Sequence, residues 1–115
     1  MIWTLSQVAL GGALGSVLRF ATVSAVGSPM ATALINIEGS LLMGAMFVLL
    51  APRFAPLIMT GILGGFTTFS AFSLDALKLY SQGQPGQALL YTAGTVLFSL
   101  IAVALGAALA RGALA

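Results

Sequence analysis

The sequence predicts an all-α membrane protein with four transmembrane helices. Of its 115 residues, 60% are hydrophobic and only 5% are charged. A bilayer core about 30 Å thick needs about 20 apolar helical residues to cross it. Four stretches of that length, separated by short segments that contain Gly and Pro, fill nearly the whole chain. We therefore expect one four-helix transmembrane domain over residues 1–115, located in the plasma membrane (the inner membrane of a bacterium).

The four spans are expected at residues 3–24, 31–51, 56–81 and 87–110. They leave no room for a soluble domain or a nucleotide site. The chain contains no Cys and no His, which removes thiolate metal sites, imidazole bases and Cys nucleophiles. We expect no enzymatic activity, because no nucleophile–base pair is present. The basic residues are scattered and form no patch, so we expect no nucleic-acid partner.

The charges give no preferred orientation in the membrane. With four spans, both termini lie on one side, together with Arg53 and Arg111. Arg19 and Lys78 lie towards the other side, so the positive-inside rule is balanced at two against two. Either the orientation is weakly encoded, or the chain inserts in both orientations and forms an antiparallel dimer.

The third span contains an unusual segment near the middle of the membrane. Two adjacent glycines, Gly64 and Gly65, are closely followed by Thr67 and Thr68. All four residues are poor in a helix interior. Non-helical backbone at membrane depth is tolerated only where it is buried in protein or lines a water-filled cavity. We therefore expect the third helix to be broken mid-membrane.

Small residues recur every four positions in each span. Examples are Gly11 and Gly15 in the first, and the series Ala102, Gly106 and Ala110 in the fourth. Small faces allow close approach of helix backbones in lipid. With 14 glycines in so short a chain, these faces pack either within one bundle or against a second copy.

Several polar side chains are expected inside the membrane. Asn36 lies deep in the second span, where its amide either joins helices or faces a polar path. Tyr91, Thr95 and Ser99 are spaced four apart, which places three hydroxyl groups on one stripe of the fourth helix. These hydroxyls either bond to their own helix or form a ladder along a path.

The remaining candidate site residues indicate that a transported ion would be an anion. Phe69 and Phe72 share one helix face, and an aromatic ring edge is electropositive. Arg19 either extends to the interface or lies in a vestibule, where it would raise the local anion concentration. No ring of carboxylates suggests a cation path. Glu38, in the second span, points to a different face from Asn36 and has no evident partner.

Three segments together resemble the CrcB/Fluc family of fluoride channels. They are GGALGSVLRF at 11–20, NIEGSLLMG at 36–44 and GGFTTFSAFS at 64–73, and the similarity extends over nearly the whole chain. The resemblance implies a passive fluoride-selective channel that exports fluoride and lowers its cytoplasmic concentration. It also implies an antiparallel, dual-topology homodimer with two pores, whose partners are a second copy, fluoride and the lipid bilayer.

The resemblance also assigns roles to individual residues. The carbonyls of Gly64 and Thr67 would hold a structural sodium ion at the dimer centre, and Arg19 would lie near a vestibule. The fluoride path would be lined by Asn36, Phe69, Phe72, Tyr91, Thr95 and Ser99. Glu38 falls where an apolar residue is expected, and Asp75 where Glu is expected.

Two other classes of protein have similar architecture. A small multidrug-resistance exporter couples protons to cationic drugs through a carboxylate in its first span, and the first span here has none. A non-transporting assembly subunit would need only the packing faces. Passive fluoride efflux from liposomes, measured with and without a proton gradient, separates these alternatives.

Overall fold

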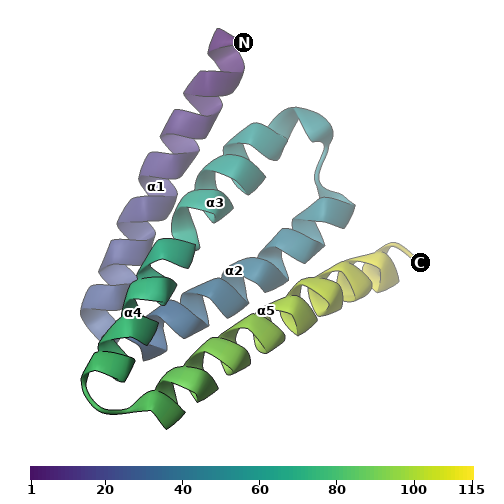
Figure 1. The fold of residues 1–115 in the computed structure, drawn as a ribbon. Helices are drawn as coiled ribbons and strands as arrows, with labels where there is room; N and C mark the ends of the chain where they lie inside the picture. Colours follow the sequence, from purple (N-terminus) through teal and green to yellow (C-terminus); the bar gives the residue numbers. More distant parts are fainter.

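The computed structural model describes residues 1–115, and the chain is helical throughout (Figure 1). The first two spans are α1 (Ile2–Val26) and α2 (Met30–Leu49). A 3₁₀ turn, η1 (Pro52–Phe54), leads into the third span, which consists of a π-helix, η2 (Pro56–Leu63), then α3 (Gly64–Phe66) and α4 (Phe69–Ser81). The fourth span is α5 (Pro85–Leu114).

Four helical segments are long and apolar enough to cross a membrane: Ile2–Val26, Met30–Leu49, Pro52–Ser81 and Pro85–Leu114. The predicted fold class is therefore confirmed, and the protein is a multi-pass membrane protein. The fourth helix runs over 85–114 rather than the expected 87–110. It begins at Pro85 because proline is favoured in the first helical turn, where no backbone N–H is needed.

The turns depend on glycine at two places. Gly27 ends α1 with φ 92°, and its N–H bonds to the Val23 carbonyl at 2.8 Å. Gly83, between α4 and α5, has φ 76°. Positive φ is disfavoured for residues with a Cβ atom, so glycine is needed in both turns. The predicted turn segments thus contain the residues that reverse the chain.

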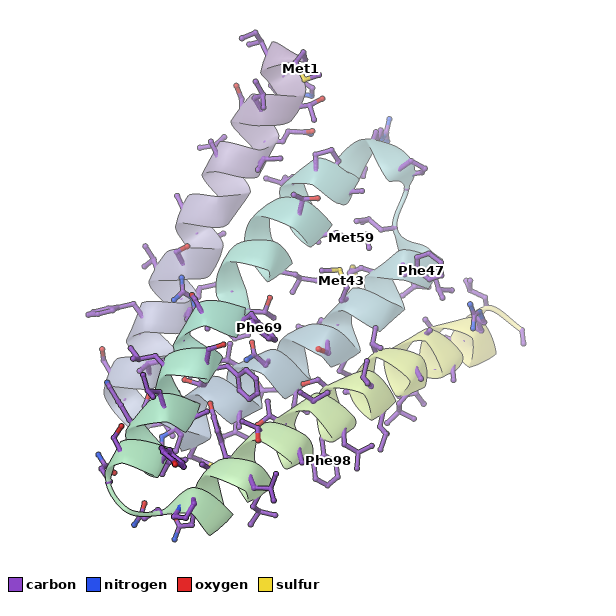
Figure 2. All side chains as sticks on the ribbon, viewed as in Figure 1. Met1, Met43, Phe47, Met59, Phe69 and Phe98 are labelled. Atoms are coloured by element: carbon purple, nitrogen blue, oxygen red, sulfur yellow. The ribbon has the colours of Figure 1, made fainter.

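The helices form two close pairs that diverge from one end of the molecule (Figure 1). One pair is α2 with α5, and the other is α1 with η2 and α3. Met43 of α2 and Met59 of η2 lie in the region between the pairs (Figure 2). Further along the chain, α4 packs against α5.

Each pair is held together by backbone contact at glycine. A Cβ atom added at Gly44 would overlap the Val103 carbonyl, and one at Gly106 would overlap the Leu41 carbonyl. Between α1 and the third span, a Cβ at Gly15 would overlap the Ile62 carbonyl. Of the two packing alternatives for these small residues, the structure shows packing within one chain.

The surface is apolar. Only 17 of the 115 residues are buried, and the largest fully buried side chains are Ile35 and Thr32 of α2. Large hydrophobic side chains point outwards on every span, including Phe47 of α2 and Phe98 of α5 (Figure 2). Such a surface is unstable in water and stable in lipid.

Candidate functional site

The third span is interrupted at Thr67 and Thr68. Thr67 (φ −81°, ψ 156°) and Thr68 (φ −152°, ψ 121°) both adopt extended backbone conformations between α3 and α4. The Thr67 hydroxyl and N–H each donate to the Leu63 carbonyl at 3.0 Å, which closes the upstream helix. The Thr68 Oγ1 accepts from the Ala71 N–H at 3.2 Å and caps α4. The expected break is therefore present, two residues long.

Asn36 of α2 hydrogen-bonds to the non-helical backbone at Thr68. Its Nδ2 donates to the Thr68 carbonyl at 2.9 Å, and its Oδ1 accepts from the Thr68 N–H at 2.8 Å. One amide side chain thus satisfies both backbone groups of a residue that has lost its helical partners. Asn36 thus joins α2 to the third span, and it also lines a cavity there.

The break leaves backbone carbonyls available. In an uninterrupted helix the Thr68 N–H would donate to the Gly64 carbonyl, but here it donates to Asn36. The Ala71 N–H would donate to the Thr67 carbonyl, but here it donates to the Thr68 hydroxyl. Neither the Gly64 nor the Thr67 carbonyl therefore has its usual intrahelical partner.

A cavity of about 370 Å³ lies beside the break, between α2, α4 and α5. No charged side chain lines it. Its polar groups come from the residues Asn36, Ser40, Thr67, Thr68, Thr95 and Ser99. One of them, the Ser99 Oγ, is buried without a hydrogen-bond partner. Buried polar groups in proteins are nearly always hydrogen-bonded, so this hydroxyl is an exception.

Two aromatic rings lie along the cavity. Phe69 and Phe72 meet edge to face, with ring centroids 5.5 Å apart and an interplanar angle of 61°. Phe72 is buried, whereas the Phe69 side chain, at the beginning of α4, is 76% exposed (Figure 2). The cavity is therefore open on the side where Phe69 stands, and one chain does not enclose it.

The hydroxyl stripe on α5 divides into two parts. Thr95 and Ser99 line the cavity, but Tyr91 does not. The Tyr91 hydroxyl donates to Asp75 Oδ2 at 3.2 Å. The centroid of the Tyr91 ring lies 5.3 Å from that of the Phe72 ring. Tyr91 thus stands next to the cavity, at the end of the row, paired with a buried carboxylate.

Two other predicted site residues lie outside the cavity. Gly64 is exposed just before the break. Arg19 is half-buried, and its Nε donates to the Gly65 carbonyl at 3.1 Å. Glu38 is exposed on α2 and does not line the cavity.

Two residues at the site were not among the predicted site residues. Thr68 lies in the break and donates its N–H to Asn36, and Asp75 accepts a hydrogen bond from the Tyr91 hydroxyl. The spacing of Thr68 from Ala71 is that of a helix N-cap and its third residue, which is a readable signal. Nothing in the spacing of Asp75 and Tyr91, 16 residues apart on different helices, indicates their contact.

The chemistry of the cavity suits a small anion. Its lining combines hydroxyl and amide groups with aromatic ring edges, and it contains no carboxylate. No cluster of three or more His, Cys, Asp or Glu side chains exists for a metal. A cation at this site would therefore be held by backbone carbonyls, as hard-oxygen ligands.

Comparison with known proteins connects this architecture to a family. The family described as CrcB-like protein, Camphor Resistance (CrcB) matches residues 6–107. A protein of Cereibacter sphaeroides named fluoride-specific ion channel FluC is 50% identical, with 97% of this chain and 98% of that protein aligned. Proteins of the same name from Paracoccus denitrificans (47% identical, 95% of each chain) and a Ruegeria species (45%, 99% of each chain) are also similar. The chain therefore belongs to the CrcB family.

Proposed function

We propose that this protein is a passive, fluoride-selective ion channel of the plasma membrane that lets fluoride leave the cell. The observation that carries the proposal is the uncharged cavity beside the helix break, with the unpartnered Ser99 hydroxyl inside it. The names of the similar proteins support it, since they are fluoride-specific ion channels. The first span contains no carboxylate, so the proton-coupled exporter is not favoured.

Fluoride is small and strongly hydrated, so a path for it must replace the water that it loses. The Ser99 hydroxyl is free to donate, and Thr95 lies one helical turn before it on α5. Asn36 uses one of its two amide N–H groups on the Thr68 carbonyl, which leaves the other for an anion. The edges of Phe69 and Phe72 add weak positive potential without a full charge.

Because no lysine or arginine lines the cavity, no side chain there holds an anion by a full opposite charge. Weak, successive donors allow an ion to leave as readily as it enters, which is what conduction requires. Tyr91 lies one helical turn before Thr95 on α5. Because its hydroxyl proton is donated to Asp75, it borders the path, while Thr95 and Ser99 supply the hydroxyl donors. We assign the fluoride path to Asn36, Phe69, Phe72, Tyr91, Thr95 and Ser99.

We also propose that the working unit is an antiparallel homodimer. The cavity is open beside the exposed Phe69 ring, and a second copy would close that side. The charge balance, with Arg53 and Arg111 on one side and Arg19 and Lys78 on the other, permits insertion in both orientations.

A sodium ion at the centre of that dimer fits the break. The Gly64 and Thr67 carbonyls lack their usual intrahelical partners, and lipid offers them no water. Two such carbonyls from each copy make a set of hard oxygen ligands. When bound, the ion would supply positive charge near the middle of the membrane. The side chain of Thr67 is not needed as a ligand, because its hydroxyl donates to Leu63.

The function is tested by efflux from liposomes that contain the purified protein. Wild-type protein should release fluoride without a proton gradient and should not release chloride. Phe69→Ile and Phe72→Ile should each slow fluoride efflux by about tenfold, the equivalent of about 1.4 kcal/mol for the loss of a ring edge. Phe98→Ile, on the outer face of α5, is the matched control and should remain at the wild-type rate. Equal release of chloride and fluoride by the wild type would refute the proposed function.

The antiparallel dimer is tested by biasing orientation. Two lysines added after Ala115 favour one orientation, and Gln82→Lys with Gln84→Lys, in the turn on the opposite membrane side, favour the other. Each variant alone should lose most of its fluoride efflux, and the two produced together should recover it. Full efflux from either variant alone, shown to be singly oriented, would contradict the dimer model.

The sodium ion is tested by replacing sodium with N-methylglucamine during purification and reconstitution. Wild-type protein should lose dimer stability, measured as a lower thermal unfolding midpoint. A Cβ at Gly64 makes only ordinary contact within the chain, 3.5 Å from the Met59 carbonyl, so Gly64→Leu should act at the dimer centre and abolish the sodium dependence. Gly94→Leu, where a Cβ meets nothing within 4 Å, is the control. An unchanged midpoint and unchanged efflux without sodium would remove the ion from the account.

A further inference from the structure

Arg19 is the only charged side chain in α1, and it makes one specific contact. Its Nε donates to the carbonyl of Gly65 at 3.1 Å, and the side chain is half-buried. Gly65 lies in α3, two residues before the break. The arginine thus bonds to the backbone of the broken helix, outside the cavity.

The glycines of α1 bring Arg19 to this position. A Cβ at Gly15 would overlap the Ile62 carbonyl and approach the Phe66 N–H nitrogen, and a Cβ at Gly65 would lie 2.7 Å from the Gly12 carbonyl. The two backbones are therefore in direct contact. Arg19 follows Gly15 by four residues and lies on the same face of α1, so it comes next in line, at the level of the break.

The Gly65 carbonyl needs a donor that the third span does not supply. In an uninterrupted helix, Gly65 would accept from the N–H of Phe69, four residues later. Here Thr67 and Thr68 are extended, and Phe69 begins a new helix. The guanidinium of Arg19 stands in the place of the missing N–H, as a charge-assisted donor.

We propose that Arg19 is a positioning residue for the helix break. It holds the Gly65 carbonyl towards α1, while Asn36 holds Thr68 from the side of α2. The break is thus fixed from both sides, and the neighbouring carbonyls of Gly64 and Thr67 remain free. In this account Arg19 acts through the backbone and not by attracting anions into a vestibule. The flux readout rests on the proposed channel function, but the contact itself does not.

The test separates the donor from the charge. In Arg19→Gln, Nε2 occupies the same position along the side chain as Nε of arginine, so the donor is kept and the charge is lost. In Arg19→Met, the side chain is as long as that of glutamine and has neither donor nor charge. Arg19→Lys keeps the charge, but its donor lies one atom further along the side chain than Nε of arginine. Arg111→Met, at the exposed end of α5, is the control for loss of a positive charge.

Fluoride efflux of the four variants is measured at low and high ionic strength. Arg19→Gln should retain most of the flux. Arg19→Met should lose at least about tenfold, as expected for removal of a hydrogen bond to a charged group, and high salt should not reduce the difference. Equal loss in the Gln and Met variants, with wild-type flux in Arg19→Lys and a loss that diminishes at high salt, would overturn the proposal in favour of anion attraction.

A second measurement detects the contact directly and needs no channel activity. Glycine ¹³C-carbonyl and arginine ¹⁵Nε labels are introduced into the Arg111→Met protein, because Arg111 adjoins Gly112. Solid-state NMR should then show one glycine carbonyl dephased by an arginine Nε, and Arg19→Gln should abolish that signal. No dephased glycine carbonyl in the folded protein would overturn the proposal. If the wild type conducts no fluoride but the dephasing is present, the channel function fails and the role of Arg19 in the break stands.

Discussion

The structure depends on one constraint, which is that the backbone at Thr67 and Thr68 leaves the helix within a membrane span, where lipid offers it no hydrogen-bond partner. Each buried backbone group without a partner costs about 1–3 kcal/mol. Asn36 removes that cost for both groups of Thr68, and the Thr68 hydroxyl does the same for the N–H of Ala71. With so many dedicated partners, the break is a specified feature and not a local irregularity.

The rest of the fold positions those partners. Glycine contacts bring α1 against the third span and α2 against α5, so that side chains of ordinary length can bond to backbone across helices. Because α2 and α5 diverge from α1 and the third span, the cavity beside the break is left open near Phe69. The same geometry that satisfies the break therefore exposes hydroxyl, amide and ring-edge groups to an ion.

Much of this could be predicted from sequence, because hydrophobic runs identify spans and the glycine–threonine segment is unfavourable in a helix interior. The side chains that hydrogen-bond to the break could not be predicted in this way. The amide of Asn36 fits many environments, and its bond to Thr68 depends on how α2 packs.

Tyr91 was expected in one row with Thr95 and Ser99, but Asp75, on another helix, binds its hydroxyl. The contact of Arg19 with Gly65 requires the close approach of two backbones. Glu38 has no role in this account.

The central claim is that the bond between Asn36 and Thr68 creates the path that fluoride crosses, and Asn36→Leu tests it most directly. This substitution keeps the size of the side chain and removes its donors and acceptor. Fluoride efflux is compared with that of Leu34→Ala, an exposed position on α2, after circular dichroism has shown equal helix content in both variants. Asn36→Leu should lose at least about tenfold in fluoride efflux, since two buried backbone groups lose their partners, while Leu34→Ala should not. A folded Asn36→Leu protein that releases fluoride at the wild-type rate would contradict the central claim.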